Sequence, residues 1–189
     1  MQRAVILAAA LAASAHALRL TRGAVLKGGI GAVGASLAVP SAGAVPPEQT
    51  TKSGLRYVVD RAGSGPKPAR GQMATLDYVL RAAVDGKPPV YVDGTKQSVP
   101  PKPQTFTLGV EGQIPGFDEA VLDMQVGEKR IVIVPPELAY GKQGTEAVGG
   151  VIPPDATLIY SIELRGLAPL AVSAEQQKWI SANPLPWEK

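Results

Sequence analysis

Bulky side chains that could bind an apolar ligand gather in residues 109–164, on segments that read as loops. Ile114 and Phe117 belong to the first of two such segments. Tyr140 lies near the start of the second, and Ile152 lies near its end. Loops lie on protein surfaces and are normally polar, so large apolar side chains at these positions indicate binding and not packing alone. We interpret this stretch as an apolar binding pocket.

The composition excludes several kinds of catalysis. The chain has no cysteine, and its single histidine is His16, far from the candidate pocket. Thiolate metal sites, disulfides and Ser–His or Cys–His nucleophilic catalysis are therefore excluded. We expect no metal and no cofactor, and a chemistry that needs neither a nucleophile nor an acid–base pair.

The basic charge of the chain is concentrated at its start. Four of the 19 basic residues and none of the 16 acidic residues lie within residues 1–44, so the remainder is close to neutral. A near-neutral body gives no electrostatic reason to expect nucleic-acid binding. The hydrophobic content of 45% is sufficient for one folded domain.

The first 17 residues resemble a signal peptide. Arg3 precedes an apolar run, Val5 to Ala13, which ends in the small-x-small pattern Ala15-His16-Ala17. The run is too short to cross a bilayer, which favours a cleaved signal over an anchor.

A second signal follows the first. Residues 18–27 are basic and free of acids, as in organelle transit segments, and residues 28–39 are apolar. Another Ala-x-Ala pattern stands at Ala42-Gly43-Ala44. This order is similar to presequences of thylakoid-lumen proteins in algae with complex plastids. The alternative is a single signal for secretion or another extracytoplasmic compartment, followed by a flexible linker. We expect mature protein from about Val45, with no membrane anchor.

Alternating patterns predict the strands that would frame the pocket. Leu55–Asp60 reads as a short strand, and a longer one begins at Gln72 and places Leu76, Tyr78 and Leu80 on one face. Three more strands are expected at 104–108, 128–134 and 157–164. Prolines throughout residues 87–103 argue against a regular central strand there, and we expect this segment to be irregular.

Residues 117–125 read as a helix, with Phe117 and Met124 on its apolar face and Gly127 as a left-handed cap. Asp118 and Glu119 complement the dipole of its first turn. One short helix among mainly antiparallel strands predicts an α+β fold, a curved antiparallel sheet wrapped around the helix.

The remaining residues, 168–189, form a tail. Ser173 is a candidate N-cap for a short helix reaching about Ser181. Trp179 and Trp187 are expected to dock the tail on the domain, although they could also form a partner site. We therefore divide the chain into a presequence (1–44), a domain (45–167) and a tail (168–189).

Several motifs in fixed order make residues 53–167 resemble the FKBP-type peptidyl-prolyl cis-trans isomerases. They are Gly71-Gln72, Asp77-Tyr78, Asp85-Gly86, Phe106-Thr107-Leu108-Gly109, Ile114-Pro115-Gly116-Phe117-Asp118-Glu119-Ala120-Val121, Met124-Gln125-Val126-Gly127-Glu128-Lys129, Tyr140-Gly141, Ile152-Pro153-Pro154-Asp155-Ala156-Thr157-Leu158 and Glu163-Leu164.

The resemblance implies roles for nine residues. It implies that the backbone N–H of Ile114 and the Tyr140 hydroxyl bind substrate carbonyls, and that Phe117 stands where the family usually has Trp. The implied catalytic residues are Tyr78, Asp93, Phe117 and Tyr140. The implied substrate-binding residues are Tyr91, Gln113, Ile114, Ile152 and Tyr160.

The chain departs from the family pattern at four positions. The family's adjacent Phe-Asp pair is represented by Tyr91 and Asp93, with Val92 between them. Gln104 replaces an aromatic residue, Gly112 replaces an acidic one, and Gln113 takes an apolar position. From the residues alone, Tyr78 and Tyr160 read as ordinary core residues, and Asp93 could equally be a turn residue.

The resemblance implies an isomerase that accelerates rotation about X-Pro bonds of proline-containing polypeptides in the thylakoid lumen. The alternative is a catalytically weak or inactive binding module or assembly chaperone on the same fold. We expect a monomer that binds neither nucleic acid nor membrane in its mature form.

Overall fold

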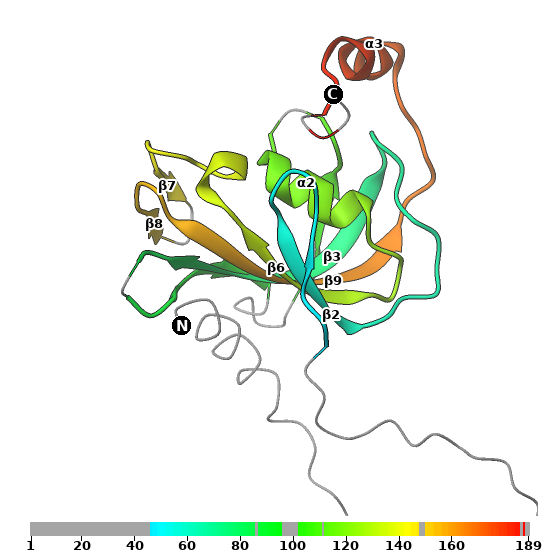
Figure 1. The fold of residues 1–189 in the computed structure, drawn as a ribbon. Helices are drawn as coiled ribbons and strands as arrows, with labels where there is room; N and C mark the ends of the chain where they lie inside the picture. Colours follow the sequence, from blue (N-terminus) through cyan, green and yellow to red (C-terminus); the bar gives the residue numbers. More distant parts are fainter. Residues whose placement is uncertain are drawn as a thin grey trace, which may run out of the picture. The chain divides into compact units, whose positions relative to one another are not determined.

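The computed structural model describes residues 46–85, 87–95, 102–110, 112–147, 150–185 and 187. The proposed presequence lies outside these residues. Within them, seven strands form one antiparallel sheet in the order β1-β2-β6-β9-β3-β4, with β5 also paired to β3. Figure 1 shows helix α2 (Pro115–Leu122) lying against one face of this curved sheet. The expected α+β architecture is confirmed.

The centre of the sheet is the pair formed by β3 (Met73–Ala83) and β9 (Thr157–Leu167). Buried residues alternate with more exposed ones along most of β3 and in β9 from Tyr160 to Leu164, because successive side chains of a strand point to opposite faces. Leu76, Tyr78 and Leu80 all lie on the buried face, as the alternating pattern predicts. On the other side of β9 come β6 (Lys129–Val134), β2 (Arg56–Arg61) and the short β1 (Gln49–Thr50).

Two strands share the free edge of β3. β5 (Gln104–Thr107) pairs with its first half, and β4 (Val90–Gly94) pairs with its second half. The expectation of no regular strand in residues 87–103 is therefore wrong for β4. The prolines of this region flank the strand at positions 88–89 and 100–103 and leave its five residues free to pair.

Helix α2 begins and ends earlier than the pattern predicts. Pro115 takes the first helical position, where its missing N–H costs nothing, and Asp123 is the C-cap. Gly127 has a φ of 89°, but it lies in the turn before β6 and does not cap the helix. Phe117 and Met124 are buried, as expected.

A second, two-stranded sheet lies beyond β6, where the sequence analysis predicts only a loop. The 3₁₀ helix η3 (Pro136–Leu138) leads to β7 (Thr145–Ala147), which pairs with β8 (Gly150–Ile152). Figure 1 shows β7 and β8 together at one end of the molecule, and β8 contacts β4.

The tail forms the predicted helix, α3 (Ala174–Ala182), with Ser173 in a capping box. Arg70 anchors it: the guanidinium donates to the carbonyls of Ile180 (3.3 Å) and Asn183, and lies 5.9 Å from the Trp179 ring centre. The predicted docking is confirmed for Trp179, and Trp187 lines a cavity beside α2. None of the described helices is long and apolar enough to cross a membrane.

We predict that Gly116→Ala lowers the free energy of unfolding by about 1–3 kcal/mol. A methyl carbon added there would lie 2.3 Å from Cγ1 of Val134, which is fully buried. This clash outweighs the gain in helix propensity of up to about 1 kcal/mol. Denaturant titration measures the difference.

The matched control is Gly166→Ala, where an added carbon has no atom within 4 Å. We expect this control to stay within about 0.5 kcal/mol of the parent protein. An equal loss in both variants would contradict the packing explanation.

Candidate functional site

Four aromatic rings from three strands and α2 form one cluster, the aromatic cluster. The ring centre of Phe117 lies 5.3 Å from that of Phe106 and 5.6 Å from that of Tyr160. Tyr78 contacts Phe106 edge-on at 5.9 Å and Tyr160 at 6.3 Å. Tilted and edge-to-face contacts at these separations are favourable, so the rings hold one another in place.

A carboxylate adjoins the aromatic cluster. The Tyr78 hydroxyl donates to Oδ2 of Asp93 at 2.5 Å, and the Gly94 amide donates to Oδ1 at 2.8 Å. A β-bulge makes this contact possible. Asp93 pairs with Leu80 and Tyr91 pairs with Arg81, so Val92 is the extra residue. Bulges redirect side chains, and this one places Asp93 beside an inward-facing residue of β3.

The three tyrosines of the region keep their hydroxyl protons at all physiological pH values. Burial raises the pKa of Tyr78, and the hydrogen bond to Asp93 raises it further. Burial also raises the pKa of Tyr140 and of Tyr160. The site therefore offers neutral phenol groups, which can donate hydrogen bonds but do not act as bases.

Two hydrogen-bond donors at the edge of the aromatic cluster have no acceptor among the described residues. One is the backbone N–H of Ile114, the extended residue that caps α2. The other is the hydroxyl of the half-buried Tyr140, which follows η3. Both residues pack against the buried core that contains Phe117 and Tyr160. Both donors are therefore available to a bound molecule.

Hydrogen bonds to both backbone polar groups of Gly109, its N–H and its carbonyl, fix the loop that leads to Ile114. The Gly109 N–H donates to Asp118 Oδ1 at 2.9 Å, and Arg70 Nε donates to the Gly109 carbonyl at 2.7 Å. Gly109 has a φ of 65°, which favours glycine. The buried Asp118 is thus more than a dipole partner. It ties the loop to the first turn of α2.

The structure brings most of the implied residues together. Tyr78, Phe117 and Tyr160 belong to the aromatic cluster, Asp93 contacts Tyr78, and Ile152 is buried in the same core. Ile114 and Tyr140 border it.

Two implied residues lie apart from the aromatic cluster. The Tyr91 ring makes no contact with it, and the Tyr91 hydroxyl is buried without a hydrogen-bond partner among the described residues. Burial raises the pKa of this hydroxyl. Gln113 is a half-exposed loop residue without a hydrogen bond to the described residues.

Sequence reasoning missed two residues of the site. Val92, not Tyr91, belongs to the buried core, and it immediately precedes Asp93. Phe106 joins Tyr78 to Phe117, although its pattern indicated only a strand face. The pair Val92-Asp93 matches the adjacent spacing of the family's Phe-Asp and could have signalled the first. In the described part of the chain, no three acidic or histidine side chains are grouped as a metal site would need.

Comparison with known proteins gives one consistent family. A family model described as FKBP-type peptidyl-prolyl cis-trans isomerase matches residues 65–165. The peptidyl-prolyl cis-trans isomerase FKBP17-2, chloroplastic, of Arabidopsis thaliana is 38% identical over 59% of this chain and 47% of its own length. The isomerase FKBP7 of Homo sapiens is 39% identical over 72% of this chain and 60% of its own.

Solved structures similar to this chain indicate the same family. The crystal structure of AtFKBP13 has a TM-score of 0.56 and 35% identity, covering 65% of this chain and 99% of that one. The crystal structure of FkpA from Escherichia coli has a TM-score of 0.55 and 34% identity, covering 66% and 53%. The chain spans about half the length of the curated relatives it matches.

We predict that Asp118→Asn removes a loss of stability that the parent protein shows as the pH rises. Burial raises the pKa of Asp118 to about 6 from 3.8, although the Gly109 N–H and Arg70 oppose this shift. The folded protein thus holds this proton more tightly than the unfolded chain. The stabilisation is full below about pH 3.8 and is lost as the pH rises through about 6.

Asparagine can still accept from Gly109 but does not titrate. The free energy of unfolding of the parent protein, minus that of Asp118→Asn, should therefore fall by roughly 2 kcal/mol between pH 4 and pH 7. Urea titrations across this range measure it. A difference that does not vary with pH would show that burial leaves this carboxyl unperturbed.

Proposed function

The chain belongs to the FKBP-type peptidyl-prolyl cis-trans isomerase family, and from this premise we propose that it accelerates rotation about X-Pro bonds in polypeptides. One observation carries the proposal. The aromatic cluster is bordered by two donors without acceptors among the described residues, the N–H of Ile114 and the hydroxyl of Tyr140. This arrangement suits a molecule with an apolar ring and flanking carbonyl groups, which is what a prolyl peptide presents.

The physical problem is a rotational barrier. Resonance in the C–N bond gives a barrier of about 18–20 kcal/mol, whereas the two isomers of an X-Pro bond differ by only about 0.5–1 kcal/mol. A catalyst therefore needs only to stabilise the twisted amide. Twisting removes resonance, so charge separation in the amide falls, and an apolar surrounding favours the twisted form over the planar one.

The residues of the site divide this task. We assign Phe117 and Tyr160, with Ile152, to contact with the proline ring. Ile114 and Tyr140 donate to the carbonyls on either side and hold the twisted form. Asp93 fixes the hydroxyl of Tyr78 and so the orientation of its ring. Gln113 and Tyr91 remain proposed contacts for the flanking residues of the substrate.

The site is complete within one chain, which supports the proposal of a monomeric enzyme. Its proposed substrates are proline-containing polypeptides during folding or assembly. Residues 45–189 carry 15 basic and 16 acidic residues, so their net charge gives no reason to propose nucleic-acid binding.

We place this activity in the thylakoid lumen of a plastid and assign the presequence to a complex-plastid alga. Two stacked signal-like segments in residues 1–44 support this location. The name of the Arabidopsis relative, which includes "chloroplastic", also supports a plastid. In this proposal residues 1–44 are removed, residues 45–167 form the isomerase domain, and residues 168–189 form its tail.

We predict that Tyr140→Phe lowers kcat/KM for a proline-containing peptide by about three- to tenfold, since one neutral hydrogen bond contributes about 0.5–1.5 kcal/mol. The variant keeps the ring and loses only the free hydroxyl. Tyr57→Phe is the matched control, because Tyr57 lies on β2 and its hydroxyl bonds Gln49. A coupled proline-isomerisation assay measures both.

Tyr57→Phe should retain the parent activity. Equal activity in all three proteins would show that Tyr140 does not contact the substrate. Isomerisation no faster than the uncatalysed reaction in the parent protein would reject the enzyme and leave a binding role on the same fold.

We predict that N-terminal sequencing of the protein isolated from its native cells gives a start near Val45. Removal of the signal peptide after Ala17 and of the following targeting segments after Ala44 would produce this end. A mature start at Leu18 would contradict delivery to the lumen and support a single secretory signal.

A further inference from the structure

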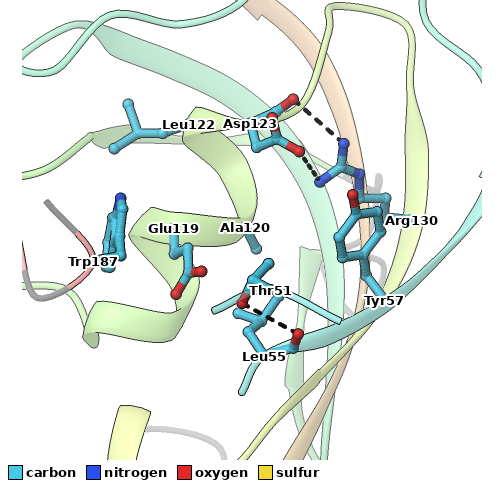
Figure 2. A pocket seen from close by; sticks show the side chains of 9 residues that line it. All are labelled: Thr51, Leu55, Tyr57, Glu119, Ala120, Leu122, Asp123, Arg130 and Trp187. Carbon is cyan, nitrogen blue, oxygen red and sulfur yellow. Dashed lines mark hydrogen bonds and ion pairs between the residues drawn. The ribbon is translucent and has the colours of Figure 1, made fainter. Parts of the chain in front are cut away.

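A cavity of about 340 Å³ lies on the side of α2 away from the aromatic cluster, here called the α2 cavity. Glu119 faces the α2 cavity. It follows Phe117 by two residues, so the two side chains point in directions roughly 200° apart around the helix axis. Figure 2 shows the side chains that line it. They are Thr51, Leu55, Tyr57, Glu119, Ala120, Leu122, Asp123, Arg130 and Trp187.

The positive charge in the wall of the α2 cavity is already compensated. The Arg130 guanidinium pairs with Glu128 and with Asp123 (3.1 Å), and it lies 4.2 Å from the centre of the Tyr57 ring. It also donates to the Asp123 carbonyl at 3.3 Å. Arg130 is therefore fully engaged within the protein and offers little attraction to an anionic ligand.

The negative charge of Glu119 is not compensated in this way. Glu119 is 93% buried, since its exposed fraction is 7%. Both of its oxygens contact the Ser53 hydroxyl, at 2.7 and 2.6 Å, but a hydroxyl has only one hydrogen to donate. No cationic side chain among the described residues pairs with Glu119. A buried carboxylate without a cation is costly unless a ligand supplies one.

The remaining walls suit an amphipathic cation. Leu55, Ala120 and Leu122 are apolar and can contact a methylene chain, while aromatic rings attract ammonium and guanidinium groups. In Figure 2, Trp187 and Glu119 lie on one side of the α2 cavity, and the Asp123–Arg130 pair lies on the other. The volume is at the lower end of the range for ligand sites, roughly 300–1,000 Å³.

We propose that the α2 cavity binds a lysine or arginine side chain of a polypeptide partner, with the cation between Glu119 and Trp187. The methylene stem of the partner residue lies against Leu122. The occupant follows from charge: an acid without a cationic partner, in a cavity with an aromatic wall, selects a cationic side chain over a neutral or acidic one. This second peptide-binding site is separate from the aromatic cluster and does not depend on isomerase activity.

The test is an NMR titration of the full-length protein with acetyl-Gly-Gly-Lys-Gly-Gly-amide, followed through the Trp187 indole N–H. The chain has two tryptophans, so Trp179→Phe assigns the signal. The neutral comparison peptide carries norleucine in place of lysine, and neither peptide contains proline. We expect millimolar dissociation for the lysine peptide and at least tenfold weaker binding of the norleucine peptide.

Two variants distinguish the effect of the Glu119 charge on peptide binding from a general loss of binding. Glu119→Gln keeps the shape of the side chain and should weaken binding of the lysine peptide at least fivefold. Glu175→Gln makes the same change on an exposed residue of α3, outside the α2 cavity, and should bind as the parent does. If Glu119→Gln does not fold, Trp187→Leu, followed through the Ala120 amide, takes its place and should weaken binding severalfold.

Three results would overturn the proposal. They are equal shifts with the lysine and norleucine peptides, unchanged affinity in Glu119→Gln, and stronger binding of a matching glutamate peptide, which would show that Arg130 governs the site. Isomerase activity plays no part in these measurements, so failure of one proposal leaves the other standing.

Discussion

The register between β3 and β9 is the constraint on which the candidate site depends. Tyr78 pairs with Ile162, and Leu80 pairs with Tyr160. Directly paired residues point to the same side of a sheet, so both tyrosines face α2. A slip of one residue would turn one of the two strands outward and separate the rings. Ten paired positions between these strands hold the register, and the buried leucines on the same face make any slip costly.

A second constraint connects the site to the tail. Arg70 donates to the Gly109 carbonyl at the start of the loop that carries Ile114, and the same guanidinium donates to carbonyls at the end of α3. Asp118 accepts a hydrogen bond from the N–H of the same glycine. The position of the Ile114 N–H is therefore set by groups from α2 and from the segment before β3, and the tail is tied to the same arginine. The tail is a structural partner of the site loop.

Periodic patterns predicted the central elements, because burial on one face dominates their energetics. The alternation through Leu76 and Leu80 located β3, and the Ser173 cap located α3. β4 was not predicted, because the prolines on both sides of this five-residue strand indicated irregular structure. The bulge at Val92 was not predicted, because the alternating pattern of a single strand does not show where its partner strand lacks a matching residue. This bulge decides which of Tyr91, Val92 and Asp93 faces inward. The motifs of the resemblance therefore located Asp93, but only the paired strands show what it contacts.

The two acids at the start of α2 show why position on a helix matters more than residue type. The sequence indicated only that both complement the helix dipole, and the structure shows that both are buried. Asp118 accepts a hydrogen bond from the Gly109 amide, which would otherwise lack an acceptor. Glu119 has only the Ser53 hydroxyl among the described residues, and its side of the helix opens on a cavity instead of a packed neighbour. An eight-residue helix with Phe117 on one side and Glu119 on the other thus presents two chemically opposite surfaces. The apolar surface suits a neutral prolyl ring, and the acidic surface suits a cation.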